Sequence, residues 1–223
     1  MKKNVLVFVS IALFAGVFAF TSCKKTNTTP PTLTLKGLEN ITISLNAGFY
    51  DQGALAENSE GDYVKVKVSS EPAFNKDLVG TYVFTYSAFD VDGNLATATR
   101  TVIVRNDAQD FEGTYSATDD GIIGAWHHEF TATLTASHTI NNRLMVDKFA
   151  AQDGCQTYVD LNWNHTANNM VEQNFWLGSP AKDFMYVGNG PVVASPTQKL
   201  FVNYTRVTGI VTNTGVCVFT KGE

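Results

Sequence analysis

The stretch GTYVFTYSAFDVDGNLATATRTVIVR, residues 80–105, decides the fold class. It holds two runs rich in β-branched and aromatic residues, 82–89 and 97–104, in which alternate side chains share a face. The Asp-Gly-Asn sequence at 92–94 can adopt the positive φ angles that a tight connection requires. The stretch is therefore predicted to form a β-hairpin with one buried face. The spacing of Asp90, Asp92 and Asn94 in DVDGN also matches the start of an EF-hand calcium loop. A plain turn is favoured, because no helix flanks the segment and no glutamate stands at the later ligand position.

Strand chemistry continues on the N-terminal side of this hairpin. Short runs of β-branched and aromatic residues alternate there with turns that contain Gly, Asn or Asp. No long stretch shows the 3.6-residue period of an amphipathic helix. The sequence therefore predicts an all-β protein that begins with a sandwich. The further strands expected in this sandwich are 33–35, 41–45 and 64–68.

Two segments of this region carry a family resemblance, GFYDQGALAENSEGDYVKVKV at 48–68 and VGTYVFTYSAFDVDGNLATATRTVIVRN at 79–106. They make residues 32–105 similar to the bacterial immunoglobulin-like (Ig-like) domains of Bacteroidetes surface lipoproteins and of some pesticidal crystal proteins. The resemblance implies a seven-stranded sandwich that acts as a spacer or adhesive module, and it implies no catalysis. The matching residues are Asp51, Gly53, Ala56, Gly80, Tyr82, Tyr86, Asp90, Gly93, Asn94, Arg100 and Val102.

A second β-domain is predicted from residue 111 to residue 223. The polar, non-periodic segment 106–110 precedes it and is expected to be a linker. Eight strand candidates suit an antiparallel β-barrel or a closed sandwich. Their order loosely resembles the barrel-like C-terminal domains of Bacteroidetes lipoproteins, whose function is unknown. The predicted strands are 111–118, 129–136, 143–149, 157–163, 171–176, 184–187, 199–208 and 216–220.

Residues 1–22 are predicted to be a signal peptide. Two lysines precede an uncharged, apolar run at 5–20, which is shorter than the roughly 20 residues of a membrane span. The small residues before Cys23 resemble the lipobox of bacterial lipoproteins, and this resemblance implies acylation of Cys23 and cleavage before it. An ordinary secreted protein and an uncleaved anchor are the alternatives. Residues 23–31 are expected to be an extended, solvated tether.

Acylation would anchor the protein to the outer membrane, on its periplasmic or its exposed face. The expected partners are this membrane and a glycan or an envelope protein. The formal net charge of −5 and the lack of a basic patch argue against nucleic acid. With Cys23 acylated, Cys155 and Cys217 remain. They form either a disulfide, as an oxidising compartment permits, or two buried free thiols.

Residue patterns for catalysis are weak, so a non-enzymatic protein with no cofactor is predicted. The sequence His127-His128-Glu129 suggests a metal site, but neighbours on a strand point to opposite faces, so no metal site is expected. Asp119 and Asp120 precede a glycine and are expected to lie in a turn and face water.

The three tryptophans are the most informative candidates for binding, and all lie in the second domain. Flat aromatic rings beside amide side chains are typical of glycan-binding surfaces. Burial is the main alternative, because Trp163 would share a strand face with Leu161 and large aromatic residues dominate β-cores. Two further alternatives are an apolar ligand in the barrel mouth and a structural or protein-interaction subunit. The predicted glycan-binding residues are Trp126, Trp163, Trp176, Asn162 and Asn164.

Overall fold

The computed structural model describes residues 27–122, 126–152, 155–175 and 184–222. Cys23, the predicted signal peptide and Trp176 lie outside these residues. Nearly all of the described chain is β-structure, which confirms the predicted fold class. In these residues no helix has the length and apolar character needed to cross a membrane.

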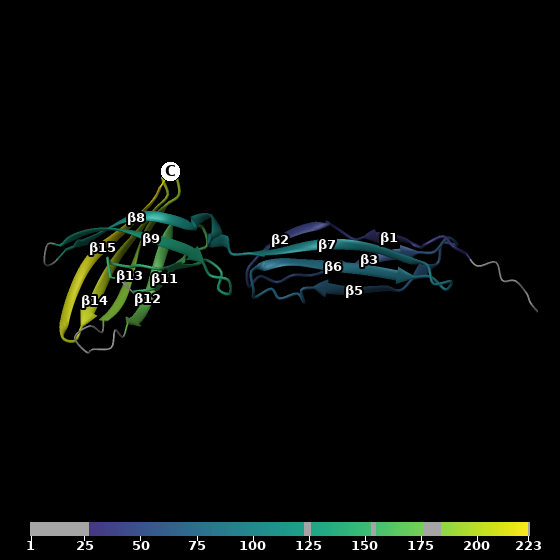
Figure 1. Cartoon of the computed structure of the whole chain (residues 1–223), viewed down its shortest axis with the longest axis horizontal. Coiled ribbons are helices and arrows are strands. Elements are labelled where there is room, and N and C mark those ends of the chain that lie inside the picture. The colour runs from purple at the N-terminus through teal and green to yellow at the C-terminus, as the bar shows by residue number, and fades with distance from the viewer. Residues whose placement is uncertain (1–26, 123–125, 153–154, 176–183, 223) are drawn as a thin grey trace, which may run out of the picture. The chain divides into compact units, whose positions relative to one another are not determined.

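Seven strands form the N-terminal sandwich, in two sheets (Figure 1). The larger sheet has the order β2-β7-β6-β5, and β2 runs parallel to β7 from Asn40 opposite Thr101 to Ser44 opposite Arg105. The smaller sheet has the order β1-β3-β4. The strands are β1 (Thr32–Leu35), β2 (Asn40–Ser44), β3 (Ala54–Glu57), β4 (Tyr63–Val64), β5 (Val66–Glu71), β6 (Gly80–Phe89) and β7 (Leu95–Arg105).

The predicted hairpin is β6 and β7. Alternate residues of both strands are buried, among them Tyr82 and Tyr86 on β6 and Val102 on β7. In the connection, one carboxylate oxygen of Asp90 accepts hydrogen bonds from the backbone N–H groups of Asp92 at 3.0 Å and Asn94 at 2.8 Å. This turn uses the Asp90 side chain for backbone groups, as the plain-turn prediction requires.

Two details of the sandwich differ from the prediction. The expected strand 64–68 is divided between β4 and β5, which belong to different sheets. Strand β3 was not predicted. Its sequence is Ala-Leu-Ala-Glu, and Ala and Glu have low β-propensity, so its extended conformation comes from pairing with β4.

Arg100 is the charged residue at the centre of the sandwich. Its side chain is 1% exposed and forms an ion pair with the Asp51 carboxylate. Its Nε donates to the carbonyl of Leu38 at 2.9 Å, and its Nη2 donates to the carbonyl of Lys36. Burial of a guanidinium group is tolerated only when its donors are satisfied. Arg100 therefore fixes the β1–β2 connection against β7.

The segment predicted as a linker forms a short 3₁₀-helix, η2 (Asp107–Phe111). Asn106 caps this helix by accepting a hydrogen bond from the N–H of Ala108 at 2.9 Å. The buried Asn106 amide also donates to the carbonyls of Ser137 at 2.7 Å and Ile140 at 2.9 Å. These bonds fasten η2 to the turn that follows β9.

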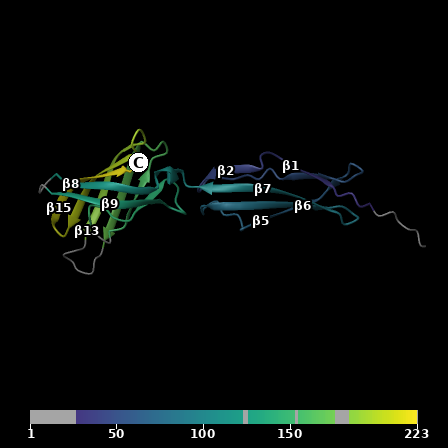
Figure 2. The ribbon, with the colours of Figure 1, turned by 45° about the horizontal axis from the view of Figure 1, so that its top comes forward.

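The C-terminal part is a closed eight-stranded antiparallel barrel, visible from a second direction in Figure 2. Each strand pairs with the next along the chain, and β15 pairs with β8 to close the barrel. Each of the eight predicted strands overlaps one of these strands, but the bounds differ: the predicted strands 143–149 and 157–163 end at Val146 and Leu161. The strands are β8 (Gly113–Gly121), β9 (His127–Ala136), β10 (Arg143–Val146), β11 (Thr157–Leu161), β12 (Ala167–Phe175), β13 (Phe184–Val193), β14 (Lys199–Thr208) and β15 (Val211–Lys221).

Aromatic side chains pack together in the interior of the barrel. The ring of Phe149 lies 5.1 Å from that of Tyr186, 5.3 Å from that of Tyr204 and 6.2 Å from that of Phe219, between ring centroids. All four residues are buried. These four rings are part of the hydrophobic core of the barrel.

We predict that Arg100→Leu lowers the free energy of unfolding by about 3 kcal/mol, because it removes the ion pair with the Asp51 carboxylate and the buried donors to the carbonyls of Leu38 and Lys36. Urea unfolding followed by far-UV circular dichroism measures the change. Arg105→Leu is the matched control, because Arg105 is 41% exposed in its ion pair with Asp110. A loss for Arg100→Leu no larger than that of the control would contradict this role.

Candidate functional site

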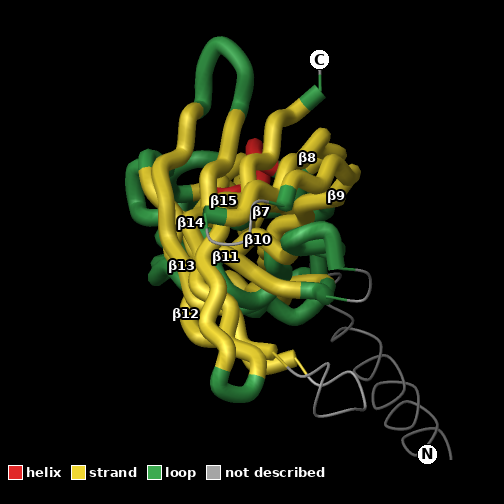
Figure 3. The backbone as a smooth tube through the Cα atoms, turned by 90° about the vertical axis from the view of Figure 1, so that its left-hand side faces the viewer, coloured by secondary structure: helices red, strands yellow, loops and turns green. Residues whose placement is uncertain are grey.

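The strand connections of the barrel alternate between two ends, because the barrel runs up and down (Figure 3). The connections β9–β10, β11–β12 and β13–β14 lie at the end where the chain enters from η2, here called the η2 end. The connections β8–β9, β10–β11 and β14–β15 lie at the opposite end, here called the distal end.

Trp163 lies at the η2 end, in the turn between β11 and β12. Its side chain is 86% exposed, so the alternative that it is a core residue is wrong. Strand β11 ends at Leu161, so the alternation that would place Trp163 beside Leu161 does not extend to it. The ring is therefore presented to solvent by a turn.

Amide side chains make this turn rigid. Oδ1 of Asn162 accepts hydrogen bonds from the N–H groups of Thr166 at 2.8 Å and Ala167 at 3.1 Å. Oδ1 of Asn164 accepts from the Thr166 hydroxyl at 2.7 Å. His165 contacts the ring of Phe111 edge-on, with 5.4 Å between centroids, and so holds the turn against η2. Of the two asparagines predicted as ligand contacts, Asn162 thus holds the backbone of the turn that carries Trp163, and Asn164 bonds a side chain of the same turn.

Trp126 lies at the distal end and is half-buried. Its indole N–H donates to the Asp119 carboxylate at 3.0 Å, and the Tyr204 hydroxyl donates to the other oxygen of that carboxylate at 2.7 Å. Burial raises the pKa of Tyr204, and its hydrogen bond to Asp119 adds to the effect, so the hydroxyl keeps its proton. Asp119 is 2% exposed, which corrects the prediction that it lies in a turn and faces water.

Gly121 and Gly215 make room for these two aromatic rings, and Gly188 allows the β14 backbone to approach closely. Gly188 and Gly215 lie opposite Tyr204 on its two neighbouring strands, and Gly121 lies opposite Gly215. A Cβ atom on Gly215 would approach the Tyr204 hydroxyl oxygen to 2.6 Å, and one on Gly121 would approach the Trp126 ring to 2.4 Å. The glycines therefore allow both rings to lie against the barrel wall.

Arg206 also lies close to Trp126 at the distal end. Its guanidinium carbon lies 5.8 Å from the centroid of the Trp126 ring. Burial raises the pKa of Tyr186, and a hydrogen bond with Arg206 acts in the opposite direction. Sequence reasoning missed Asp119, Tyr204 and Arg206 as neighbours, because their partners are remote in the chain. The glycines inside strands β8, β13 and β15 were the available signal.

The predicted set of glycan-binding residues is therefore not one site. Trp126 and Trp163 lie at opposite ends of the barrel, and Trp126 donates its N–H to a buried carboxylate. Cys155 and Cys217 are both buried and free. The structure therefore contains two free thiols in place of the alternative disulfide. Burial raises the pKa of the Cys155 thiol to about 12, which keeps it protonated and unreactive.

The outer face of the barrel carries an ion pair. Nδ1 of His127 lies 2.5 Å from an Asp120 carboxylate oxygen, and its Nε2 lies 3.7 Å from Glu129. The hydrogen bond to Asp120 raises the pKa of His127, with smaller contributions from Glu129. Among the residues that the structure describes, no group of three or more His, Cys, Asp and Glu side chains is placed to hold a metal ion.

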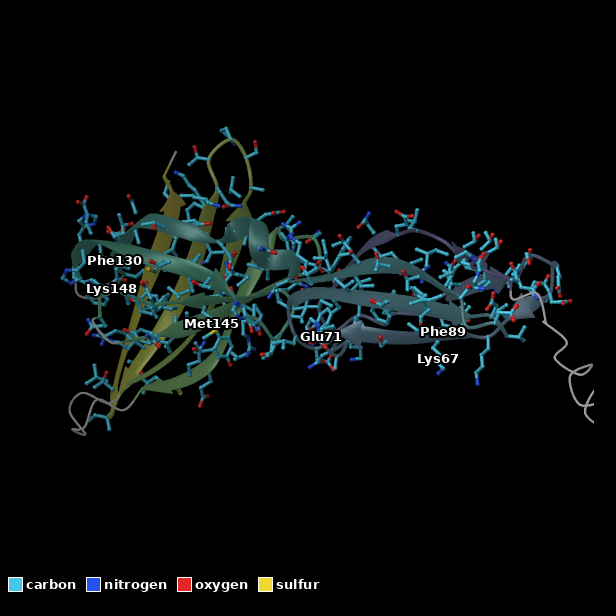
Figure 4. The ribbon with its side chains drawn as sticks, turned by 45° about the vertical axis from the view of Figure 1, so that its right-hand side comes forward. Lys67, Glu71, Phe89, Phe130, Met145 and Lys148 are labelled. Atoms are coloured by element: carbon cyan, nitrogen blue, oxygen red, sulfur yellow. The ribbon has the colours of Figure 1, made fainter. Side chains whose placement is uncertain are left out.

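A groove of about 490 Å³ is open on strands β8, β9 and β15. Four of its eight lining residues carry a hydroxyl group, and the Glu129 carboxylate and the Phe130 side chain also line it. Lys148 lies beside it, with its ammonium nitrogen 6.0 Å from the centroid of the Phe130 ring (Figure 4). Neither Trp126 nor Trp163 lines this groove. Its lining is Ser116, Ala117, Thr118, Glu129, Phe130, Thr131, Val218 and Thr220.

We predict that Asp119→Ala lowers the free energy of unfolding by about 2–3 kcal/mol, because the Trp126 N–H and the Tyr204 hydroxyl lose their buried acceptor. Denaturant unfolding followed by tryptophan fluorescence measures the change. Asp120→Ala is the matched control on the adjacent, outward-facing position, where the side chain is 50% exposed. Equal effects of the two substitutions would show that the Asp119 carboxylate does not hold this cluster.

We also predict that Asp120→Asn lowers the pKa of His127 towards its ordinary value, because the raised pKa depends mainly on the Asp120 hydrogen bond. In the wild type His127 therefore stays protonated to a higher pH than in the variant. Titration of the His127 ring resonances by NMR measures both values. Glu129→Gln serves as the comparison and is expected to cause a smaller decrease. A larger decrease for Glu129→Gln would contradict this ranking.

Comparison with known proteins adds a family for the first domain and two distant structural likenesses. No curated protein sequence matches the chain. The lipoprotein BT2262 from Bacteroides thetaiotaomicron covers 85% of this chain and 99% of its own, with 15% identity and a TM-score of 0.33. The CBM51-2 structure in complex with GlcNAc and INT domains from Clostridium perfringens ZmpB covers 86% of this chain and 44% of its own, with 14% identity and a TM-score of 0.29. These TM-scores are too low to carry an argument.

The family match is more informative than these likenesses. Residues 33–104 match the family described as "Bacterial surface protein, Ig-like domain". The match covers all seven strands of the sandwich and omits only Thr32, the first residue of β1, and Arg105, the last residue of β7. It confirms the Ig-like resemblance and indicates a protein of the bacterial cell envelope. The N-terminal sandwich is therefore an Ig-like domain of the kind found in bacterial surface proteins.

Proposed function

We propose that this protein is a non-enzymatic lipoprotein of the outer membrane, and that its barrel binds a glycan at Trp163. Acylation at Cys23 would anchor it, as the leader sequence predicts. The Ig-like domain would then act as a spacer, and the barrel as the binding module. The observation that carries the binding proposal is the exposed ring of Trp163 on a turn that side-chain hydrogen bonds hold in place.

The exposure of this ring needs an explanation. A large apolar side chain that stays in water does not contribute the about 2–3 kcal/mol of folding free energy that its burial would provide. The turn 162–166 is held by side-chain hydrogen bonds, so it presents the ring in a defined position. A preorganised aromatic ring binds with a small loss of conformational entropy. A flat ring of this kind suits the apolar face of a sugar.

The surroundings of Trp163 are polar, as a glycan site requires. Asn164 and Thr166 are exposed beside it, and Asn162 is half-buried. Their amide and hydroxyl groups can exchange hydrogen bonds with sugar hydroxyls at the rim of the stacked ring. Trp126 is omitted from this site, because it lies at the distal end and its indole N–H already bonds Asp119.

An envelope location is also compatible with the two free thiols. An exported protein meets oxidising conditions, in which exposed thiols form disulfides. Cys155 and Cys217 are both buried inside the barrel, and burial raises the pKa of each thiol. The barrel therefore keeps the thiols from reacting and does not depend on a disulfide.

A second candidate function, protein–protein interaction, has its own observation. At the distal end Ile122, Ile210 and Val211 are 66%, 102% and 54% exposed. The N–H of Ile122 donates to the carbonyl of Thr214 on β15 at 3.0 Å, so the β8–β9 connection begins beside the strand that starts at Val211. Exposed apolar side chains grouped on adjacent turns are typical of a surface that binds another protein.

We predict that Trp163→Ala weakens glycan binding by about 30-fold or more, because truncation of an aromatic anchor costs about 2 kcal/mol or more. A glycan array identifies the ligand, and calorimetric titration then compares the wild type with the variant. The melting temperature is expected to change little, since the Trp163 side chain is 86% exposed.

Ile210→Ala is the matched control, because it removes an exposed apolar side chain at the other end of the barrel. It is expected to leave glycan affinity unchanged. Glycan binding that survives Trp163→Ala would reject the proposed site. Absence of binding across the array, together with capture of an envelope protein that Ile210→Ala abolishes, would favour the interaction subunit.

A further inference from the structure

We propose that the sandwich rests on the membrane surface through its two turns 58–62 and 90–94, here called the two-turn tip. The proposal depends on the acylation of Cys23 in the proposed function. It goes further by naming the surface of the Ig-like domain that meets the bilayer. It is carried by three observations: the similarity of the two turns, the contacts of Asn27 with both, and the short chain between Asn27 and Cys23.

The two turns have the same construction. In the first, Oδ1 of Asn58 accepts hydrogen bonds from the N–H groups of Glu60 at 3.0 Å and Asp62 at 2.8 Å. In the second, Oδ1 of Asp90 accepts hydrogen bonds from the N–H groups of Asp92 at 3.0 Å and Asn94 at 2.8 Å, which are the equivalent positions. Each turn has a glycine at its fourth position, with φ of 86° and 88°. Both turns are therefore rigid.

Asn27 connects the two turns. Its backbone N–H donates to the Asp92 carboxylate at 3.3 Å, and its carbonyl accepts from the Asn94 amide at 2.8 Å. Its own side-chain amide donates to the Ser59 hydroxyl at 2.6 Å. The chain that arrives from Cys23 is thus fixed to both turns, five residues before β1 begins at Thr32. The predicted free tether of residues 23–31 is shortened accordingly.

The remaining length is too small for the tip to leave the membrane surface. Cys23 and Asn27 are separated by four peptide units, which span at most about 14 Å in any conformation. Acyl chains on Cys23 would lie in the hydrocarbon layer and place this residue among the headgroups. Asn27, and with it the two-turn tip, therefore lies within about 14 Å of the headgroup position of Cys23.

The side chains of the tip suit a bilayer interface. Val91 in the second turn is 94% exposed, and Tyr63 and Phe89, which flank the two turns, are 76% and 51% exposed. Lys67 lies on β5, the strand next to β6, which carries Phe89 (Figure 4). Apolar and aromatic side chains of this kind partition into the headgroup region. The carboxylates of Glu60 and Asp62 would be repelled by anionic lipid, so the surface fits zwitterionic headgroups.

The test places a fluorophore at the tip of the acylated, full-length protein. Val91→Cys is labelled with an environment-sensitive dye, and Cys155 and Cys217 do not compete because both are buried. The protein is reconstituted into phosphatidylethanolamine–phosphatidylcholine vesicles with and without a nitroxide-labelled lipid. We expect at least twofold quenching by the nitroxide.

Two controls separate this proposal from the proposed function. Insertion of twelve Gly and Ser residues between Cys23 and Asn27 leaves the tip intact and lengthens the tether, so quenching should fall to background. Equal quenching with the insertion would overturn the role of the short tether. An acylated protein that binds vesicles without quenching at position 91 would overturn the tip proposal alone. Cys23→Ser that still fractionates with membranes would overturn the anchor.

Discussion

Pairing of β15 with β8 is the constraint on which the barrel depends. Seven residue pairs, from Gly215 opposite Gly121 to Lys221 opposite Tyr115, join the last strand to the first. This closure removes both sheet edges, so all strands have two neighbours. It also fixes which side of each strand faces inward. Asp119 and Asp120 are adjacent in sequence, yet one meets Tyr204 and Trp126 inside and the other meets His127 outside.

Most strand positions could be predicted from the sequence, because the signal is local. Alternation of apolar and polar residues reports which face of a strand is buried, and turn residues mark where a strand ends. This was sufficient for the β6–β7 hairpin and for the eight barrel strands. Strand β3 lacked the local signal, because an Ala-Leu-Ala-Glu segment becomes a strand only through its partner.

The buried polar clusters could not be predicted, because their partners are distant in the chain. Arg100 is bonded to Leu38 at a separation of 62 residues, and Tyr204 is bonded to Asp119 at a separation of 85. A polar residue in a strand gives no sign of whether such a partner exists. The same limit explains Trp163: periodicity suggested burial, and only the end of β11 at Leu161 placed the ring in solvent.

The two proposed functional surfaces use different physical means to reach a defined position. Trp163 is held by hydrogen bonds inside one short turn, so its position is a property of the barrel alone. The two-turn tip is held through Asn27, whose bonds join two turns and the chain that leads to Cys23. Loss of one set of bonds leaves the other intact, since they share no residue. The proposed binding and the proposed anchoring would therefore vary independently, because each depends on a separate turn.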